Sequence, residues 1–319
     1  MNRAILVTGA SGFVGQALLG RLAERPDTLV ALTRSLRTDL PARVIQRIAG
    51  PIESLDEEGW LTNLEGIDTI VHLAAIAHIG PGVPEDAYDA VNHRAVARMG
   101  AAAVKAGVRR VVFLSSVRAQ TGASAPLPFD ETTPPSPTDA YGRAKLAAER
   151  ALAALPLETV ILRPALIVGA PPKGNLALLL KFAATGLPLP LASLSAPRSA
   201  ISLADVAEIV LRALDEPEMA GGTFILADPE PLTPGAMIAA LRQGLGMGPR
   251  LVACPPALLR LPFAMTGRAD MFERLAGALV ARPEALIRLG WQPRKPVLRA
   301  LEELGAQHRC AGQKSESPR

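Results

Sequence analysis

The chain has 319 residues, of which 49% are hydrophobic and 20% are charged, and its formal net charge is +4. This composition supplies a sizeable core and excludes a largely disordered protein, while the length suits one large domain or two modest ones. Aromatic residues make up only 3% and the basic residues are scattered, so we expect no nucleic-acid-binding surface.

The first half of the chain alternates short β-branched runs with alanine-rich helical runs. Strands are predicted at residues 4–8, 29–33, 43–49, 69–74, 110–115 and 158–163. Helices are predicted at residues 12–24, 84–107 and 140–154. Apolar strands that alternate with helices indicate a parallel sheet covered on both faces. The predicted fold class is therefore α/β, a doubly wound parallel sheet (Rossmann fold) with its ligand crevice at the carboxyl ends of the strands.

The composition of the sequence changes after Pro164. Prolines and glycines crowd residues 169–198, and the later segments are helical without regular strands between them. We expect a nucleotide-binding domain over residues 1–165, to which residues 199–228 return, with a helix over 203–214. Residues 166–304 are expected to form a smaller, mostly helical substrate domain. Residues 305–319 are expected to be a polar, disordered tail.

A glycine-rich segment joins the first predicted strand to the first predicted helix. Glycines here permit a tight turn and a close approach of the backbone to a pyrophosphate, which the helix N-terminus then attracts. The expected cofactor-binding residues of this segment are Gly9, Ser11, Gly12, Phe13, Val14 and Gly15. The second strand ends at Thr33-Arg34 without an acidic residue. Because arginine accommodates a ribose 2′-phosphate, this ending favours NADP(H) over NAD(H).

Tyr141 and Lys145 are four residues apart in a predicted helix and therefore share one face of it. A cation beside a phenol favours the phenolate, so we expect a lowered pKa for Tyr141 and an acid/base role. Ser115 and Ser116 follow a buried strand, where a hydroxyl stabilises charge that develops on a reacting oxygen. Either serine fits that role from sequence alone.

No metal ion, disulfide framework or membrane segment is expected. Cys254 and Cys310 form no CxxC pair, and the four histidines lack ligand spacing. The longest apolar stretch, residues 176–194, is interrupted by Lys181 and by two prolines. An apolar strand follows directly on the first three residues, which leaves no room for a signal peptide. We therefore expect a cytoplasmic protein.

Together these motifs resemble the extended short-chain dehydrogenase/reductases, the NAD-dependent epimerase/dehydratase family. The resemblance covers about residues 4–304 and rests on TGASGFVG, HLAA, VNHRAV, the paired serines, YGRAK and LRP. The segments SSVRAQ, KGN, GLPLPLAS and PRSAISLADVAE resemble the branch of UDP-glucose 4-epimerase-like proteins and UDP-4-keto-sugar reductases. Three positions depart from the family pattern: Thr33-Arg34 and Gly50-Pro51 stand where acidic residues are usual, and Val117 stands where serine or threonine is common.

The resemblance implies roles for individual residues. Tyr141 would be the acid/base, Lys145 would hold the nicotinamide ribose, and Ser116 would bind the sugar oxygen. Further cofactor contacts are implied for Leu73, Ala74, Ala75, Asn92 and Pro164. Contacts to the UDP diphosphate are implied for Asn175, Arg198 and Arg268.

We therefore expect an NAD(P)-dependent epimerase or reductase that acts at C4 of a UDP-sugar, in the synthesis of surface-polysaccharide precursors. The family also implies a homodimer. Two alternatives remain open from sequence: an NADP-binding sensor or assembly protein without catalysis, and a carbonyl reductase of a non-nucleotide substrate.

Overall fold

The structure is a computed structural model that describes residues 3–77, 83–265 and 269–316. The chain divides into two compact units. The N-terminal unit comprises Met1–Gly122, Thr133–Pro164 and Val206–Leu226, and the C-terminal unit comprises Ala123–Thr132, Ala165–Asp205 and Ala227–Arg319. Each unit is built from more than one segment of the chain.

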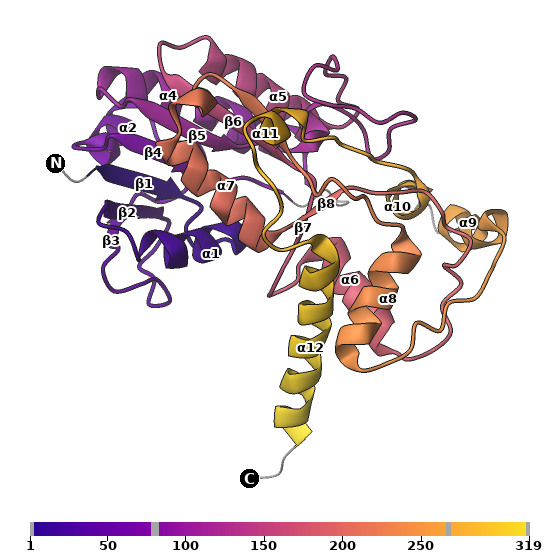
Figure 1. The fold of residues 1–319 in the computed structure, drawn as a ribbon. Coiled ribbons are helices and arrows are strands. Elements are labelled where there is room, and N and C mark those ends of the chain that lie inside the picture. The colour runs from indigo at the N-terminus through magenta and orange to yellow at the C-terminus, as the bar shows by residue number, and fades with distance from the viewer. Residues whose placement is uncertain (1–2, 78–82, 266–268, 317–319) are drawn as a thin grey trace. The chain divides into compact units, whose positions relative to one another are not determined.

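The N-terminal unit is a doubly wound α/β fold around a seven-stranded parallel sheet of order β3-β2-β1-β4-β5-β6-β9 (Figure 1). Its strands are β1 (Ala4–Thr8), β2 (Thr28–Thr33), β3 (Ile45–Ile48), β4 (Thr69–His72), β5 (Arg110–Leu114), β6 (Glu158–Pro164) and β9 (Thr223–Leu226). The strand order reverses between β1 and β4, and such a reversal places a ligand crevice beyond the carboxyl ends of these strands. The predicted fold class is confirmed.

Helices cover both faces of this sheet (Figure 1). They are α1 (Phe13–Leu22), α2 (Glu57–Leu64), α3 (Glu85–Asp89), α4 (Ala95–Lys105), α5 (Ala140–Ala153) and α7 (Leu203–Asp215). One turn of π-helix, Ala90–Arg94, joins α3 to α4. The core between the sheet and α2, α4 and α5 is apolar, with Trp60, Met99 and Leu152 all fully buried. Burial on this scale is the main stabilising contribution to the unit.

The C-terminal unit is mostly helical, but its described residues also include a pair of parallel strands. These are β7 (Leu166–Val168) and β8 (Ala200–Ser202). Its helices are α6 (Gly174–Ala184), α8 (Pro234–Leu245), α9 (Pro256–Met265), α10 (Ala269–Ala276), α11 (Glu284–Arg288) and α12 (Val297–Glu316). The expectation that no regular strand follows residue 165 is therefore wrong, since β7 and β8 form here and β9 joins the large sheet.

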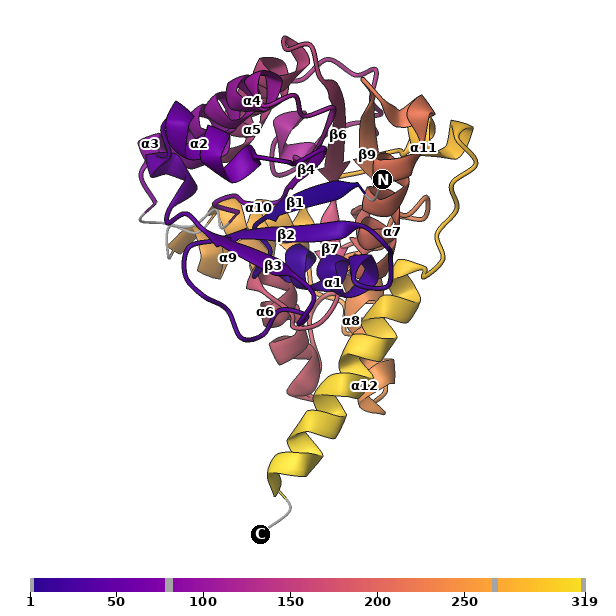
Figure 2. The same cartoon turned by 90° about the vertical axis from the view of Figure 1, so that its left-hand side faces the viewer.

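The predicted disordered tail is also wrong, because residues up to Glu316 continue helix α12. Helix α12 runs beside α8 in both views (Figures 1 and 2). The helices approach closely at two glycines: a Cβ on Gly244 would collide with the carbonyl oxygen of Glu302, and one on Gly305 with that of Leu241. Packing against α8 therefore stabilises a helix whose sequence is polar, which a reading of composition alone does not anticipate.

The domain boundaries differ from the predicted ones at two places. The returning segment is Val206–Leu226 rather than residues 199–228, and Ala123–Thr132 joins the C-terminal unit. The latter segment pairs there with a second loop, through the bonds from Ala125 N to the Ala278 oxygen (2.8 Å) and from Phe129 N to the Val280 oxygen (3.0 Å). These long-range main-chain bonds have no counterpart in the local sequence pattern. No helix in the described part of the chain has the length and apolar character needed to cross a bilayer.

Candidate active site

The glycine-rich segment forms the turn between β1 and α1. Gly9 has a φ of +67°, which favours glycine, and a Cβ there would lie 2.7 Å from the Ala74 nitrogen. A Cβ on Gly15 would collide with the carbonyl oxygen of Gly9. Gly12 caps α1, and its nitrogen bonds to that same carbonyl oxygen at 2.9 Å. The turn thus leaves no room for larger side chains and directs a helix N-terminus at the crevice, where anions are stabilised.

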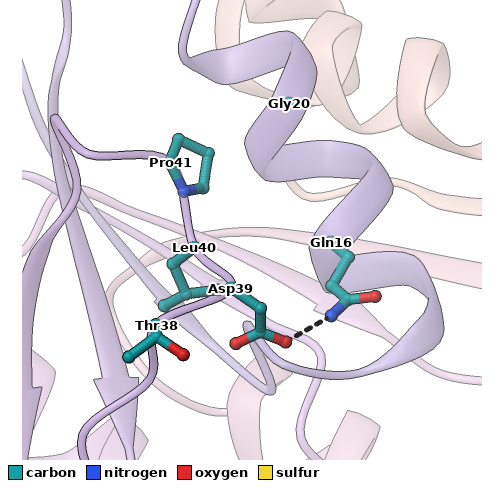
Figure 3. Close-up of a pocket in the computed structure, with 6 residues that line it drawn as sticks. All are labelled: Gln16, Gly20, Thr38, Asp39, Leu40 and Pro41. Atoms are coloured by element: carbon teal, nitrogen blue, oxygen red, sulfur yellow. Dashed lines mark hydrogen bonds between the residues drawn. The ribbon is translucent and has the colours of Figure 1, made fainter.

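The loop after β2 carries two arginines that differ in their ion pairing. Arg37 is paired with Asp39, whose carboxylate also accepts a hydrogen bond from Gln16 of α1 at 2.9 Å (Figure 3). Arg34 is exposed and has no ion-pair partner among the described residues. The side-chain oxygen of Thr33 is buried and has no hydrogen-bond partner there. Arg34 is therefore the arginine left available to an anion in this loop.

A hollow of about 480 Å³ lies between this loop and α1. It is lined by Gln16, Gly20, Thr38, Asp39, Leu40 and Pro41 (Figure 3). Its lining includes none of the glycines of the turn after β1 that sequence reasoning assigned to the cofactor.

Asn92 organises the loop that follows β4. Its buried amide accepts a hydrogen bond from the Ile76 nitrogen (2.9 Å) and donates one to the Ile76 oxygen (3.0 Å). Asn92 lies in the π-helical turn, a feature that often marks functional sites. The preceding residues of the loop, Leu73–Ala75, are half-buried beside the glycine turn. Asn92 therefore fixes the backbone of the loop that contains Leu73–Ala75, the residues for which cofactor contacts are implied.

The two serines after β5 point to different partners. The Ser115 hydroxyl is buried and hydrogen-bonds to the Glu149 carboxylate. The Ser116 hydroxyl accepts a bond from the Arg118 nitrogen (3.1 Å) and is hydrogen-bonded to the Tyr141 phenol, an interaction that lowers the pKa of the phenol. The structure therefore joins Ser116, and not Ser115, to the tyrosine.

Tyr141 lies in the first turn of α5, and its ring meets that of Tyr88 edge to face with centroids 6.2 Å apart. Burial raises the pKa of Tyr141 to about 12, and the Ser116 hydrogen bond offsets this only in part. The expected lowering of this pKa is therefore wrong in direction. Desolvation of the phenolate outweighs the favourable neighbours in this state of the protein.

Lys145 shares the α5 face with Tyr141 but bonds elsewhere. Its ammonium donates to the Leu114 oxygen at 2.8 Å and lies 4.5 Å from the centre of the Phe113 ring. Burial lowers the pKa of Lys145 to about 7, while the nearby Glu149 acts in the opposite direction. Lys145 is thus a buried amine poised between its two charge states at neutral pH.

Sequence reasoning missed a buried ionic network behind these residues. Glu149 receives bonds from Arg163 Nε (3.0 Å) and Nη2 (2.5 Å), and Arg163 Nη1 donates to Gln120 (3.0 Å). Glu149 follows Lys145 by four residues, so the sequence YGRAKLAAE already places it on the same face of α5 as Lys145. Arg163, in contrast, meets it only because β6 pairs with β5.

The predicted diphosphate ligands belong to the C-terminal unit. Asn175 lies in the first turn of α6, and Arg268 falls outside the described residues. The Arg198 guanidinium donates to the main-chain oxygens of Gly277 and, at 3.0 Å, Ala123. Arg198 therefore also ties together the loops of its own unit.

A parallel sheet with a glycine turn at its switch point, and a serine after β5 that is hydrogen-bonded to a tyrosine of α5, form an arrangement typical of enzymes that use a nicotinamide cofactor. Residues 5–227 match the NAD dependent epimerase/dehydratase family. This match spans more than half of the chain, and the protein belongs to that family.

Comparison with known proteins gives similar sequences of nearly equal length. The UDP-glucose 4-epimerase of Vibrio cholerae is 29% identical over 303 residues, 92% of each chain. The N-acetyl-alpha-D-glucosaminyl-diphospho-ditrans,octacis-undecaprenol 4-epimerase of Escherichia coli O157:H7 is 28% identical over 286 residues, 87% of this chain and 82% of the relative.

Solved structures confirm the fold. The Bordetella bronchiseptica enzyme WbmG, in complex with NAD, is similar with a TM-score of 0.77 and 20% identity over 98% of this chain and 96% of that one. The UDP-N-acetylglucosamine 4-epimerase of Bacillus cereus gives a TM-score of 0.73 and 22% identity over 97% and 100%.

Proposed function

We propose that the enzyme oxidises or reduces C4 of a sugar that is joined to a diphosphate, as a 4-epimerase or a 4-keto-sugar reductase. The observation that carries this proposal is the hydrogen-bonded pair of Ser116 and Tyr141 at the carboxyl edge of the sheet, backed by the buried Lys145. A pair of hydroxyls is suited to a carbonyl or secondary alcohol, because one stabilises charge on the oxygen while the other moves its proton.

The two relatives support this substrate class. Both are named as 4-epimerases, and in both names the sugar is attached to a diphosphate. They differ in the carrier beyond the diphosphate, which is uridine in one and undecaprenol in the other. UDP is the carrier that sequence resemblance implies for this chain.

The residues present fit a dinucleotide. The turn formed by Gly9 and Gly15 lets the backbone approach a pyrophosphate. The buried Thr33 oxygen, for which the described residues supply no hydrogen-bond partner, offers a bond to an adenosine ribose. Arg34, which has no ion-pair partner among the described residues, favours a 2′-phosphate and hence NADP(H). Pro164 ends β6 at the same edge of the sheet.

The chain's own groups handle the proton. Because its pKa is raised, Tyr141 holds its proton at neutral pH and is ready to donate it to a C4 carbonyl oxygen. In the oxidative direction it must first lose that proton, and positive charge nearby makes this easier. Lys145 would bind the nicotinamide ribose and supply that charge. A bound nicotinamide would supply the hydride chemistry that oxidation or reduction at C4 requires.

The experiment is turnover of UDP-N-acetylglucosamine and its 4-keto-6-deoxy derivative by the wild type, Tyr141→Phe and Tyr88→Phe. We expect Tyr141→Phe to lose about 10²–10⁴-fold in kcat with unchanged cofactor affinity. Tyr88→Phe is the matched control, since it removes a neighbouring phenol hydroxyl and keeps the ring that meets Tyr141 edge to face. Equal activity in Tyr141→Phe would refute the acid/base assignment.

The released nucleotide distinguishes the two reactions. An epimerase recycles its cofactor in place, so denaturation of the purified protein should release stoichiometric NAD. A reductase consumes NADPH and should be purified with an empty site that binds NADPH. Release of NAD would also overturn the assignment of Arg34 to a 2′-phosphate.

A further inference from the structure

The C-terminal unit contains an apolar pocket of about 310 Å³ between α6, α8, α9 and α10, the helices labelled in Figure 1. This volume lies within the range of ligand sites in proteins, about 300–1,000 Å³. The pocket is lined by Leu166, Leu178, Leu179, Phe182, Leu189, Pro190, Leu191, Arg198, Ser199, Pro234, Met237, Ile238, Leu259, Leu275 and Leu279. Thirteen of these fifteen residues have apolar side chains.

Polar groups of this lining are engaged in hydrogen bonds, mostly with residues behind the pocket wall. The Ser199 hydroxyl donates to the Ala281 oxygen (3.2 Å) and accepts from the Ala281 nitrogen (3.0 Å). The main-chain nitrogen of Leu189 donates to the carbonyl oxygen of Arg250. The carbonyl oxygen of Leu189 accepts hydrogen bonds from the main-chain nitrogens of Val252 and Leu191. A nucleobase presents several donors and acceptors that are costly to bury without partners. The pocket therefore suits a hydrocarbon better than a base.

Helix α9 extends the apolar surface outward from this pocket. It contributes Leu259 to the wall, while Leu258, Leu261 and Met265 on its outer side are 60%, 57% and 80% exposed. Their spacing of three and four residues places them in one row along the helix. Large apolar side chains exposed in a row are uncommon on soluble surfaces and mark contact sites. A chain longer than the pocket would continue along this row.

Arg198 borders the pocket, so that a cation adjoins a hydrocarbon-lined space. This combination matches an amphiphile in which a diphosphate is esterified to an apolar chain. The relative from Escherichia coli, which aligns over 87% of this chain, is named for a substrate of that chemistry. Building on the C4 chemistry proposed above, we infer that the substrate is a polyprenyl diphosphate-linked sugar, whose proximal isoprene units bind in this pocket.

The test compares three N-acetylglucosaminyl diphosphates as substrates of the full-length enzyme: the geranyl ester, the methyl ester and the uridine ester. Each methylene transferred from water to an apolar site gains about fourfold in affinity. We expect the geranyl ester to have a KM at least about 50-fold below that of the methyl ester. Leu259→Asp should remove this advantage, and Leu298→Asp, an exposed leucine of α12, is the matched control.

Calorimetric titration with geranyl diphosphate and methyl diphosphate gives a second readout that needs no turnover. Tighter binding of geranyl diphosphate, lost in Leu259→Asp and kept in Leu298→Asp, would support the pocket assignment even if no sugar is turned over, and would then refute only the C4 chemistry. Equal binding of both compounds, or preferred turnover of the uridine ester with an unchanged KM in Leu259→Asp, would overturn the inference and leave the C4 chemistry standing.

Discussion

Replacing Lys145 by methionine should remove a specific pH dependence from the stability of the protein. The Lys145 side chain is 1% exposed, and burial lowers its pKa from 10.5 to about 7. Between pH 7 and pH 10.5 the folded protein therefore binds fewer protons at this site than the unfolded chain does. Unfolding takes up a proton in this window, so the free energy of unfolding rises with pH.

The size of the effect follows from these two pKa values. A full difference of one proton changes the free energy of unfolding by about 1.4 kcal/mol per pH unit. Because Lys145 is half-protonated at pH 7 in the folded state, the gain from pH 7 to pH 9 is about 2 kcal/mol. Methionine is a long, unbranched side chain that carries no charge, so the Lys145→Met protein should lack this gain.

Urea unfolding of the wild type and Lys145→Met at pH 7, 8 and 9 measures the difference directly. The two stability curves should diverge by about 2 kcal/mol across this range. Lys181→Met, which alters an exposed lysine of α6, should follow the wild type at all three pH values. Parallel curves for wild type and Lys145→Met would refute the conclusion that this amine is buried near its neutral state.

Three further predictions concern groups around the site. Ser115→Ala should cost about 1–3 kcal/mol in urea unfolding, because Glu149 loses a buried hydrogen bond, whereas kcat should stay within a few-fold of wild type. Arg163→Met should lower the free energy of unfolding by about 3–5 kcal/mol, because the buried Glu149 carboxylate loses its counter-charge. The double variant with Glu149→Leu should recover much of this loss, and additive losses in the double variant would contradict the pairing. Gly15→Ala should weaken dinucleotide binding at least about tenfold in a fluorescence titration, since the new methyl group meets the Gly9 oxygen; unchanged affinity would argue against the turn as the cofactor site.

The sequence was sufficient for the strands and helices that have strong local patterns. Buried β-branched runs gave β1, β2, β4, β5 and β6 to within a few residues, and the glycine turn followed from its position between a strand and a helix. The two edge strands of the sheet, β3 and β9, differed in this respect. The run that became β3 was predicted, but Thr223–Leu226 was not, because a short strand at a sheet edge is defined by its pairing with β6 rather than by its own pattern.

The candidate site residues show the same contrast between what a local sequence pattern determines and what tertiary packing determines. Tyr141, Lys145 and Ser116 could be proposed from the sequence because they lie in short motifs, but their chemistry depends on what surrounds them. The spacing of Tyr141 and Lys145 suggested that the lysine lowers the phenol pKa, whereas the structure turns the ammonium toward the Leu114 carbonyl. Burial then dominates both groups. The degree of desolvation depends on how the folded core packs around a group, and a short sequence motif does not determine this packing.

The order in which the chain visits its two units has a consequence for synthesis on the ribosome. Strand β9 is the last to join the large sheet, yet Ala165–Asp205 of the other unit lies between β6 and the segment that carries β9. While that stretch is being translated, β6 remains an unpaired sheet edge, the kind of surface on which nascent chains aggregate. The N-terminal unit therefore cannot be completed before Ala165–Asp205 of the C-terminal unit has been synthesised, and a ribosome stalled between residues 165 and 222 should expose an aggregation-prone intermediate.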